Sequence, residues 1–209
     1  MKNHYFSVYS GLPKEVYYLF VARLVNSMGF FIAPLFTLIL TQKLGMGKAE
    51  AGTTMSLLIL TQAPCVLLGG KLADHIGRKR MLISGSIASA LLYLVCSLGF
   101  TGRTMVYVLI AAADCIAFAY PAVDAMLADL TRPEERRPAY SLLYLGTNIG
   151  MALSPIVGGL LFTSHLSLLF ILDAVTTFAS MTIVIIKVND PFVRREKAED
   201  NTPGISLLS

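Results

Sequence analysis

Charged residues are scarce in this 209-residue sequence: they make up 14% of it, whereas soluble domains average about 25%. Cysteine is scarce too, and Cys65, Cys96 and Cys115 are too few to build a disulfide-stapled scaffold. Hydrophobic residues make up 55% of the chain, and the mean hydropathy is +0.67. These values exclude a disordered or collagen-like chain and argue against a soluble domain.

Several chemical signatures are also missing from the sequence. No Ser-His-Asp pattern, phosphate-binding loop, paired glycosidase-type carboxylates or His/Cys metal spacing is readable, so we expect neither an enzyme nor a metal or cofactor site. Basic residues interleaved with aromatic ones are missing, so we expect no nucleic-acid partner. Asn-Pro-Ala, which an aquaporin-type channel would carry twice, does not occur.

Long uncharged runs predict membrane-spanning helices. A spanning helix needs about 20 mostly apolar residues, and the gaps between charged residues supply six such segments. We expect them at about 16–42, 51–70, 81–102, 104–128, 138–162 and 166–186. The fold class is therefore an all-α membrane protein, with a short segment 1–13, a six-helix bundle over 14–187, and a tail or start of a linker over 188–209.

Lysine and arginine are distributed unevenly between the two sides of these spans. Thirteen lie on the side that holds both termini, and three lie on the other: Lys43, Lys48 and Arg103. Basic loops stay in the cytoplasm, so we expect a multi-pass protein of the cell membrane with both termini cytoplasmic. This bias also accounts for the net charge of +4.

The second and fifth segments resemble each other. Segment 56–60 leads to Gly69-Gly70, and segment 141–145 leads to Gly158-Gly159. A 3+3 inverted repeat would pair these two helices, and we expect that arrangement. Two Leu-rich helices also resemble each other by chance, so the pattern supports a repeat without requiring one.

A short connection between the second and third spans carries the most specific motif. Gly77 permits a tight turn, and Arg78 can bond back to the Asp74 carboxylate. Together with Gly70 these residues form a specific pattern. Basic residues that only hold a loop on the cytoplasmic side would not need it. Lys79 and Arg80 also suit that simpler anchoring role. The motif residues are Gly70, Asp74, Gly77, Arg78, Lys79 and Arg80.

This stretch closely resembles the signature loop of the major facilitator superfamily, Gly-x-Leu-Ala-Asp-Arg-x-Gly-Arg-Arg/Lys. His75 stands where Arg or Lys is usual. The resemblance implies that Asp74 and Arg78 form a cytoplasmic gate with an acidic residue that closes helix 4, and Asp129 occupies that place. It also implies that the chain corresponds to the N-terminal six-helix half of a twelve-helix fold.

The fifth span extends the resemblance. Residues 148–159 are similar to the antiporter motif of drug and multidrug exporters, with Ser154 where Gly is usual. Small residues recur there every fourth position and make a ridge suited to close helix packing, whether static or flexing. Pro155 is expected to kink the helix. The motif comprises Gly146, Gly150, Ser154, Pro155, Gly158 and Gly159.

Polar residues inside the spans are the candidates for substrate binding and proton coupling. Arg23 lies on one helix face with Asn26, and it either snorkels to the interface or lines a cavity. Asp124 lies at a similar depth, so we expect an Arg23–Asp124 interaction. Exporters often carry Arg in the outer half of helix 4, and here Asp114 lies nearby. The candidates are Arg23, Asn26, Asp114, Asp124 and Asn148; for Asp173 a structural role is favoured.

Two functions remain open from the sequence. The first is a secondary transporter that exports small organic molecules by alternating access, driven by the proton gradient, with the bilayer and a small-molecule substrate as partners. It would need a homodimer or a second six-helix half. The alternative is a truncated or half-length fragment without transport activity of its own, acting at most through helix association or dimerisation.

Overall fold

In a computed structural model, the structure describes residues 8–99 and 102–190, and these residues form helices with no strand among them. Six helical segments are long and apolar enough to cross a membrane, as the sequence predicts. The first crossing consists of three pieces, and each of the others is one helix. In chain order the elements are α2 (Lys14–Met28), α3 (Ile32–Leu38), the π-helical turn η1 (Ile39–Lys43), α4 (Lys48–Ile76), α5 (Arg78–Ser97), α6 (Arg103–Leu130), α7 (Pro133–Phe162) and α8 (Leu166–Lys187).

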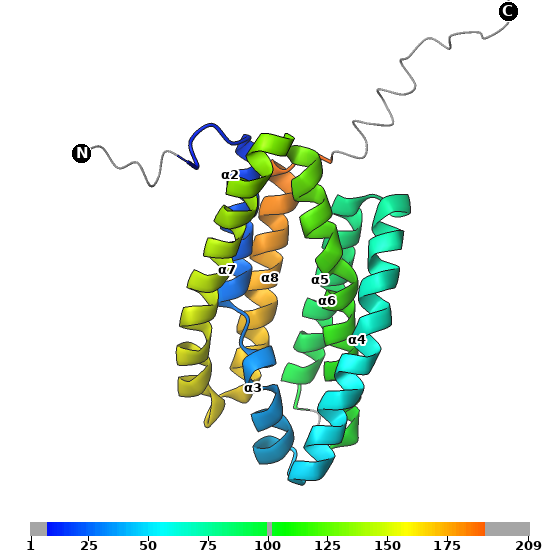
Figure 1. The fold of residues 1–209 in the computed structure, drawn as a ribbon. Helices are drawn as coiled ribbons and strands as arrows, with labels where there is room; N and C mark the ends of the chain where they lie inside the picture. The colour runs from blue at the N-terminus through cyan, green and yellow to red at the C-terminus, as the bar shows by residue number, and fades with distance from the viewer. Residues whose placement is uncertain (1–7, 100–101, 191–209) are drawn as a thin grey trace, which may run out of the picture.

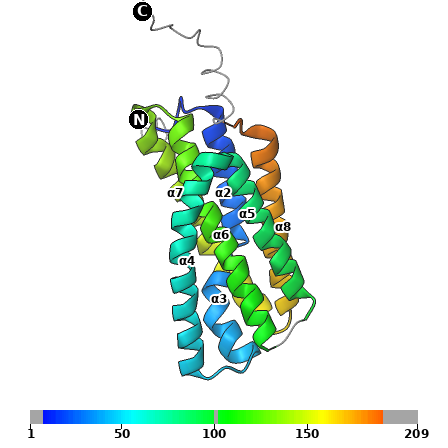
Figure 2. The same ribbon diagram turned by 90° about the vertical axis from the view of Figure 1, so that its right-hand side faces the viewer.

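The six crossings pack as two groups of three. In each group, one helix from one half of the chain lies between two helices from the other half. The first crossing, α2, packs against α7 and α8, and the fourth, α6, packs against α4 and α5. Contact between α5 and α8 joins the two groups, as Figures 1 and 2 show. If α2 is exchanged with α6, α4 with α7 and α5 with α8, each of these contacts becomes another contact of the same set. That symmetry confirms the predicted 3+3 inverted repeat.

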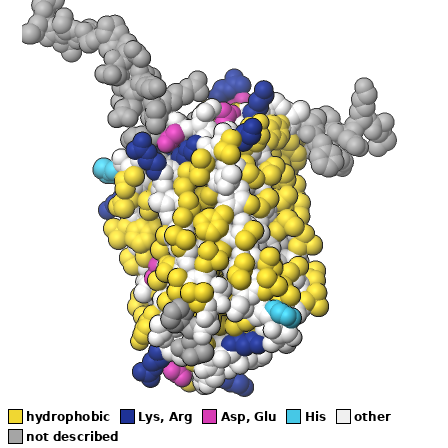
Figure 3. All heavy atoms as spheres, turned by 180° about the vertical axis from the view of Figure 1, so that it is seen from behind, with side chains coloured by type: hydrophobic (Ala, Val, Ile, Leu, Met, Phe, Trp, Pro, Cys, Tyr) yellow, Lys and Arg dark blue, Asp and Glu magenta, His cyan; other side chains and the backbone are white. Residues whose placement is uncertain are grey.

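The outer surface is apolar around its middle and charged at both ends (Figure 3). On α4, Leu60 and Leu67 are each 71% exposed, and on α7 Leu160 is 75% exposed. Inside, one buried cluster around Met126 and Leu127 lies toward the end that carries Lys14, and another surrounds Ile39 and Leu109. An apolar belt between two polar ends matches a bilayer, so the protein is a multi-pass membrane protein.

The connection between the second and third spans is shorter than the sequence predicts. We expected a loop over 70–80, but α4 continues to Ile76 and α5 begins at Arg78. Gly77 alone reverses the chain, with φ +104°, a conformation that side chains rarely adopt. Most of the signature motif therefore lies on helix ends, where its side chains are held more rigidly than on a loop.

The fifth span also begins earlier than expected. We placed its start at about 138, whereas α7 begins at Pro133. Proline suits the first turn of a helix because its missing N–H would have no intrahelical partner. Glu135 accepts a hydrogen bond from the Arg132 backbone N–H at 2.9 Å, which satisfies a donor at the start of the helix. Pro138 falls in the first turns and does not interrupt the helix.

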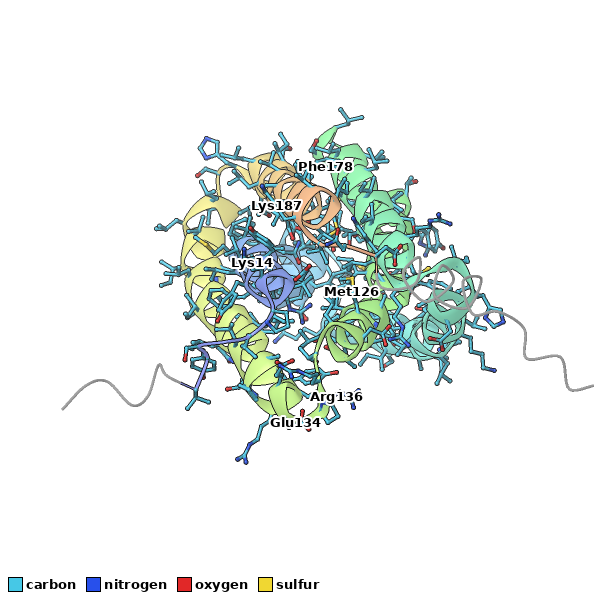
Figure 4. All side chains as sticks on the ribbon, turned by 90° about the horizontal axis from the view of Figure 1, so that it is seen from above. Lys14, Met126, Glu134, Arg136, Phe178 and Lys187 are labelled. Carbon is cyan, nitrogen blue, oxygen red and sulfur yellow. The ribbon has the colours of Figure 1, made fainter. Side chains whose placement is uncertain are left out.

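Parts of the predicted domain scheme lie outside the described residues. Residues 1–7 and 191–209 belong to the expected N-terminal segment and tail, so those two boundaries stay predictions. Within the described part, Lys14 and Lys187 lie at one end of the bundle, onto which Figure 4 looks. We call this end the Lys14 end.

Candidate functional site

A cluster around Arg78 joins three helix ends at the Lys14 end. The Arg78 guanidinium forms an ion pair with Asp129 near the end of α6 and another with Asp74 on α4, at 3.3 Å. Its Nη1 also donates to the backbone carbonyl of Ala125, at 2.6 Å. The side chain of Asp129 is 13% exposed, whereas that of Asp74 is 62% exposed. Arg78–Asp129 is therefore the more shielded pair, and it ties α5 to α6.

The neighbouring basic residues have separate roles. Lys79 Nζ donates to the carbonyls of Ile185 and Val188, at 2.9 and 2.7 Å, and so binds the last carbonyls of α8. Cations at a helix C-terminus satisfy unpaired carbonyls and the helix dipole. Arg80 is exposed, and His75 hydrogen-bonds the Lys71 carbonyl of its own helix. Lys79 thus caps the end of α8.

A cavity of about 300 Å³ lies inside the bundle, between α2, α5, α6, α7 and α8. Arg23 and Asn26, both predicted as cavity residues, line it. Asp114, Asp124 and Asn148 do not. The remaining lining is mostly apolar, with hydroxyl groups added by residues such as Thr147, Tyr120 and Thr177.

Arg23 is held by two neutral side chains. Its Nε donates to the Thr147 hydroxyl on α7 at 3.0 Å, and Nη2 donates to the Tyr120 hydroxyl on α6 at 2.9 Å. The guanidinium also lies 4.9 Å from the centre of the Tyr120 ring, within cation–π range. Asn26 donates to Thr177 on α8 at 3.1 Å. These bonds fix Arg23 in the cavity wall between the two three-helix groups.

The expected Arg23–Asp124 interaction is absent from the described part of the chain. Asp124 is exposed, and its backbone carbonyl accepts a hydrogen bond from Tyr140. Val123 lines the cavity, and an α-helix turns about 100° per residue, so the next side chain points elsewhere. The rotation of α6 about its own axis, which the sequence does not give, therefore separates Asp124 from Arg23.

The other two polar candidates lie on different faces. Asp114 on α6 accepts a hydrogen bond from Thr61 on α4 at 3.1 Å, at the contact between those helices. Asn148 is exposed, and its side chain donates to the Tyr144 carbonyl one turn earlier on α7. Asp114 therefore remains a half-buried carboxyl at mid-span with one neutral partner, and Asn148 has a local partner.

The small-residue ridge of α7 packs against the first crossing. A Cβ added at Gly150 would meet Ser27 at its side chain and backbone, and one at Gly158 would meet Leu35 at 3.1 Å. Gly146 faces Phe20, and Ser154 donates to the Phe30 carbonyl. Pro155 and Gly159 are exposed on the opposite face. The ridge thus lets two helix backbones approach closely.

Sequence reasoning missed a break in the first crossing. The helix stops at Met28 and restarts at Ile32, on the cavity side of the bundle near Phe30. Asp173 on α8 is 5% exposed, and its carboxylate accepts the backbone N–H groups of Phe31 and Ile32. Gly29 in an apolar run and Pro34 in the first turn of α3 were the local signals. The Gly29 backbone packs so close to Thr176 that a side chain would not fit.

Comparison with known proteins gives a consistent result. The family model described as Major Facilitator Superfamily matches residues 19–207. A Na(+), Li(+), K(+)/H(+) antiporter of Planococcus maritimus is 30% identical over 149 residues, covering 68% of this chain and 34% of that protein. Multidrug resistance protein MdtH of Proteus mirabilis (strain HI4320) is 29% identical over 166 residues, covering 72% and 38%.

A solved structure shows the same fold. The crystal structure of peptide transporter POT in complex with sulfate superposes with a TM-score of 0.76 at 21% identity, over 92% of this chain and 44% of that one. The chain therefore spans between a third and two fifths of the length of the curated relatives given above.

Proposed function

This chain belongs to the major facilitator superfamily, and on that premise we propose that it is the first six-helix bundle of a secondary active transporter and not an enzyme. The observation that carries the proposal is the cavity between the two three-helix groups, with Arg23 and Asn26 in its wall. Sites at the interface of two inverted repeats are typical of transporters. The substrates are small organic molecules, and the direction is export.

Proton coupling is the proposed energy source. The relative named as a Na(+), Li(+), K(+)/H(+) antiporter supports it, since that name gives the proton as one of the exchanged ions. Asp114 is the candidate for the proton-carrying group because it lies at mid-span with a single hydroxyl as partner. No resident cofactor or metal is needed for this mechanism.

The cluster around Arg78 is the proposed gate. It joins α4, α5 and α6 at the Lys14 end, so breaking Arg78–Asp129 would loosen the start of α5 from the end of α6. Alternating access requires one end of the cavity to close while the other opens. Gly70 faces Pro121 of α6 and Arg80 is exposed, so these two residues contribute helix packing and surface charge to the motif.

We place the Lys14 end in the cytoplasm and the protein in the cell membrane. Within the described part, nine Lys and Arg residues lie at that end and three at the other. The cytoplasmic side of a membrane protein carries the excess of basic loop residues. Reporter fusions after Lys43 and after Lys187 test this: the opposite orientation of the two reporters would overturn it.

A second bundle is the proposed partner, supplied by a homodimer or by another six-helix half. The chain covers 34% of the antiporter's length, and α4 and α7 leave Leu67 and Tyr144 71% exposed. The coverage of 34% also favours the alternative, in which this chain alone does not transport and acts at most through helix association.

Flux through reconstituted protein separates these possibilities. The 209-residue chain is placed in liposomes, a pH gradient is imposed, and the movement of fluorescent organic dyes of either charge is followed. We expect gradient-dependent flux from an oligomer, lost in Arg78→Ala and kept in Arg137→Ala, which removes an exposed arginine near the same end. A monomer by light scattering with no flux would support the half-length alternative.

A further inference from the structure

The cavity wall contains one charged group, the Arg23 guanidinium, among the residues that the structure describes. No carboxyl group is among the described residues that line the cavity, and three that lie within the spans are committed elsewhere or point away. Asp114 pairs with Thr61, Asp173 accepts backbone N–H groups at the break in the first crossing, and Asp124 is exposed. The cavity therefore carries a positive charge that no carboxylate lining it neutralises.

The neutral partners of Arg23 orient it without neutralising it. The hydroxyls of Thr147 and Tyr120 accept two of the hydrogen bonds that its five N–H donors can make. Three N–H donors of a guanidinium that lines the cavity are therefore left for a ligand. A partly buried guanidinium that two hydrogen bonds hold in place is a strong site for a planar acceptor such as a carboxylate.

The rest of the wall selects an apolar body. Leu82, Ile116, Val123 and Met181 supply hydrocarbon from α5, α6 and α8 around the same space. Binding sites for small molecules combine such walls with few polar groups that fix orientation. One cation in an apolar chamber of about 300 Å³ suits a compact molecule with one acidic head.

We propose that the cavity binds amphiphilic organic anions, with the carboxylate or sulfonate head on Arg23 and the apolar body against α5, α6 and α8. This inference rests on the proposed function and specifies its substrate class. Thr147 and Tyr120 are positioning residues, since they act on the ligand through the guanidinium.

Three matched probes test the charge preference: 2-naphthoate, 2-naphthamide and 2-naphthylmethylammonium. They share an apolar body and differ in head-group charge. Equilibrium dialysis against the full 209-residue chain in a neutral detergent measures each affinity, and the naphthalene fluorescence is readable because the chain has no tryptophan. We expect naphthoate to bind at least about tenfold tighter than the other two, the ratio that one charge-assisted hydrogen bond supplies.

Variants assign the preference to Arg23. Arg23→Gln should bring the three affinities within about twofold of one another, while the matched control Lys48→Gln, which removes an exposed lysine outside the cavity, should keep the ratio. Thr147→Val keeps the charge and removes one partner, so naphthoate affinity should fall several-fold with the preference retained. This variant tests the site even if Arg23→Gln does not fold.

Other results would overturn the proposal. These are equal or tighter binding of the ammonium probe, a ratio that Arg23→Gln leaves unchanged, or no binding of any probe. Competition by short-chain phosphatidylglycerol without naphthoate binding would assign Arg23 to a lipid head group and would also overturn it. Naphthoate binding without flux in liposomes would leave the anion site standing and remove transport by this chain alone.

Discussion

The carboxylate of Asp173 on α8 accepts the backbone N–H of Phe31, two residues after the first crossing stops being helical. The next N–H, that of Ile32, donates to the same carboxylate. The first N–H groups of a helix have no intrahelical partner, and inside a membrane water cannot supply one. One buried acid thus stabilises a broken helix by accepting the N–H of Ile32, at the start of α3.

Removing this carboxylate should destabilise the bundle. Asp173→Ala leaves the Ile32 N–H without this acceptor, while the Phe31 N–H keeps the Gly29 carbonyl at 2.7 Å, so we expect a loss of about 1–3 kcal/mol of unfolding free energy. Asp173→Asn keeps one acceptor oxygen and should lose less. Thermal unfolding in detergent, followed by circular dichroism, measures both. Glu50→Ala, at an exposed position, is the control and should change stability by less than about 0.5 kcal/mol. Equal effects of all three would contradict the capping role.

The ridge on α7 yields a test with a control in the same helix. Gly150→Ala puts a methyl group against the Ser27–Met28 backbone, so α2 and α7 must separate. Overpacking of this kind costs about 1–3 kcal/mol. At Gly159 nothing lies within 4 Å of an added Cβ. Gly159→Ala should therefore be neutral or stabilising, since Ala favours a helix by about 1 kcal/mol. Similar melting temperatures for the two variants would refute the close approach.

The Arg78 cluster should matter more than surface charge at the same end. Arg78→Ala removes the bond to Ala125 and leaves the shielded Asp129 without this partner. We expect a loss of about 1–3 kcal/mol. Arg137→Ala removes an exposed charge and should stay within about 0.5 kcal/mol of the parent. Chemical denaturation of both variants in mixed micelles gives the comparison, and an Arg78→Ala protein as stable as Arg137→Ala would disprove the ranking.

Lys79 should stabilise the end of α8 locally. Lys79→Met keeps the length of the side chain but removes the donor to the Ile185 and Val188 carbonyls. A cation at a helix C-terminus contributes about 0.3–1 kcal/mol. Hydrogen exchange should therefore speed up by a few-fold in the last turn of α8 and stay unchanged in α4. Lys71→Met is the matched control on an exposed site. Unchanged exchange at the end of α8 would contradict the cap.

Some features depended on local pattern and could be predicted. The six spans were predicted because a bilayer requires about 20 apolar residues in sequence, whatever the neighbours are. The turn at Gly77 was predicted because a single residue type tolerates its backbone conformation. The length of the connection was overestimated, because helices extend past the membrane when their ends find partners such as Asp129.

The sequence by itself determined the number of crossings, the uneven distribution of basic residues and the motif that resembles the superfamily. The tertiary structure decided which polar groups meet. Arg23 pairs with Thr147 and Tyr120 rather than Asp124, and Asp173 caps α3 from another helix. Hydrophobic runs are local, whereas partners depend on how each helix is rotated, and one residue turns a helix face by about 100°.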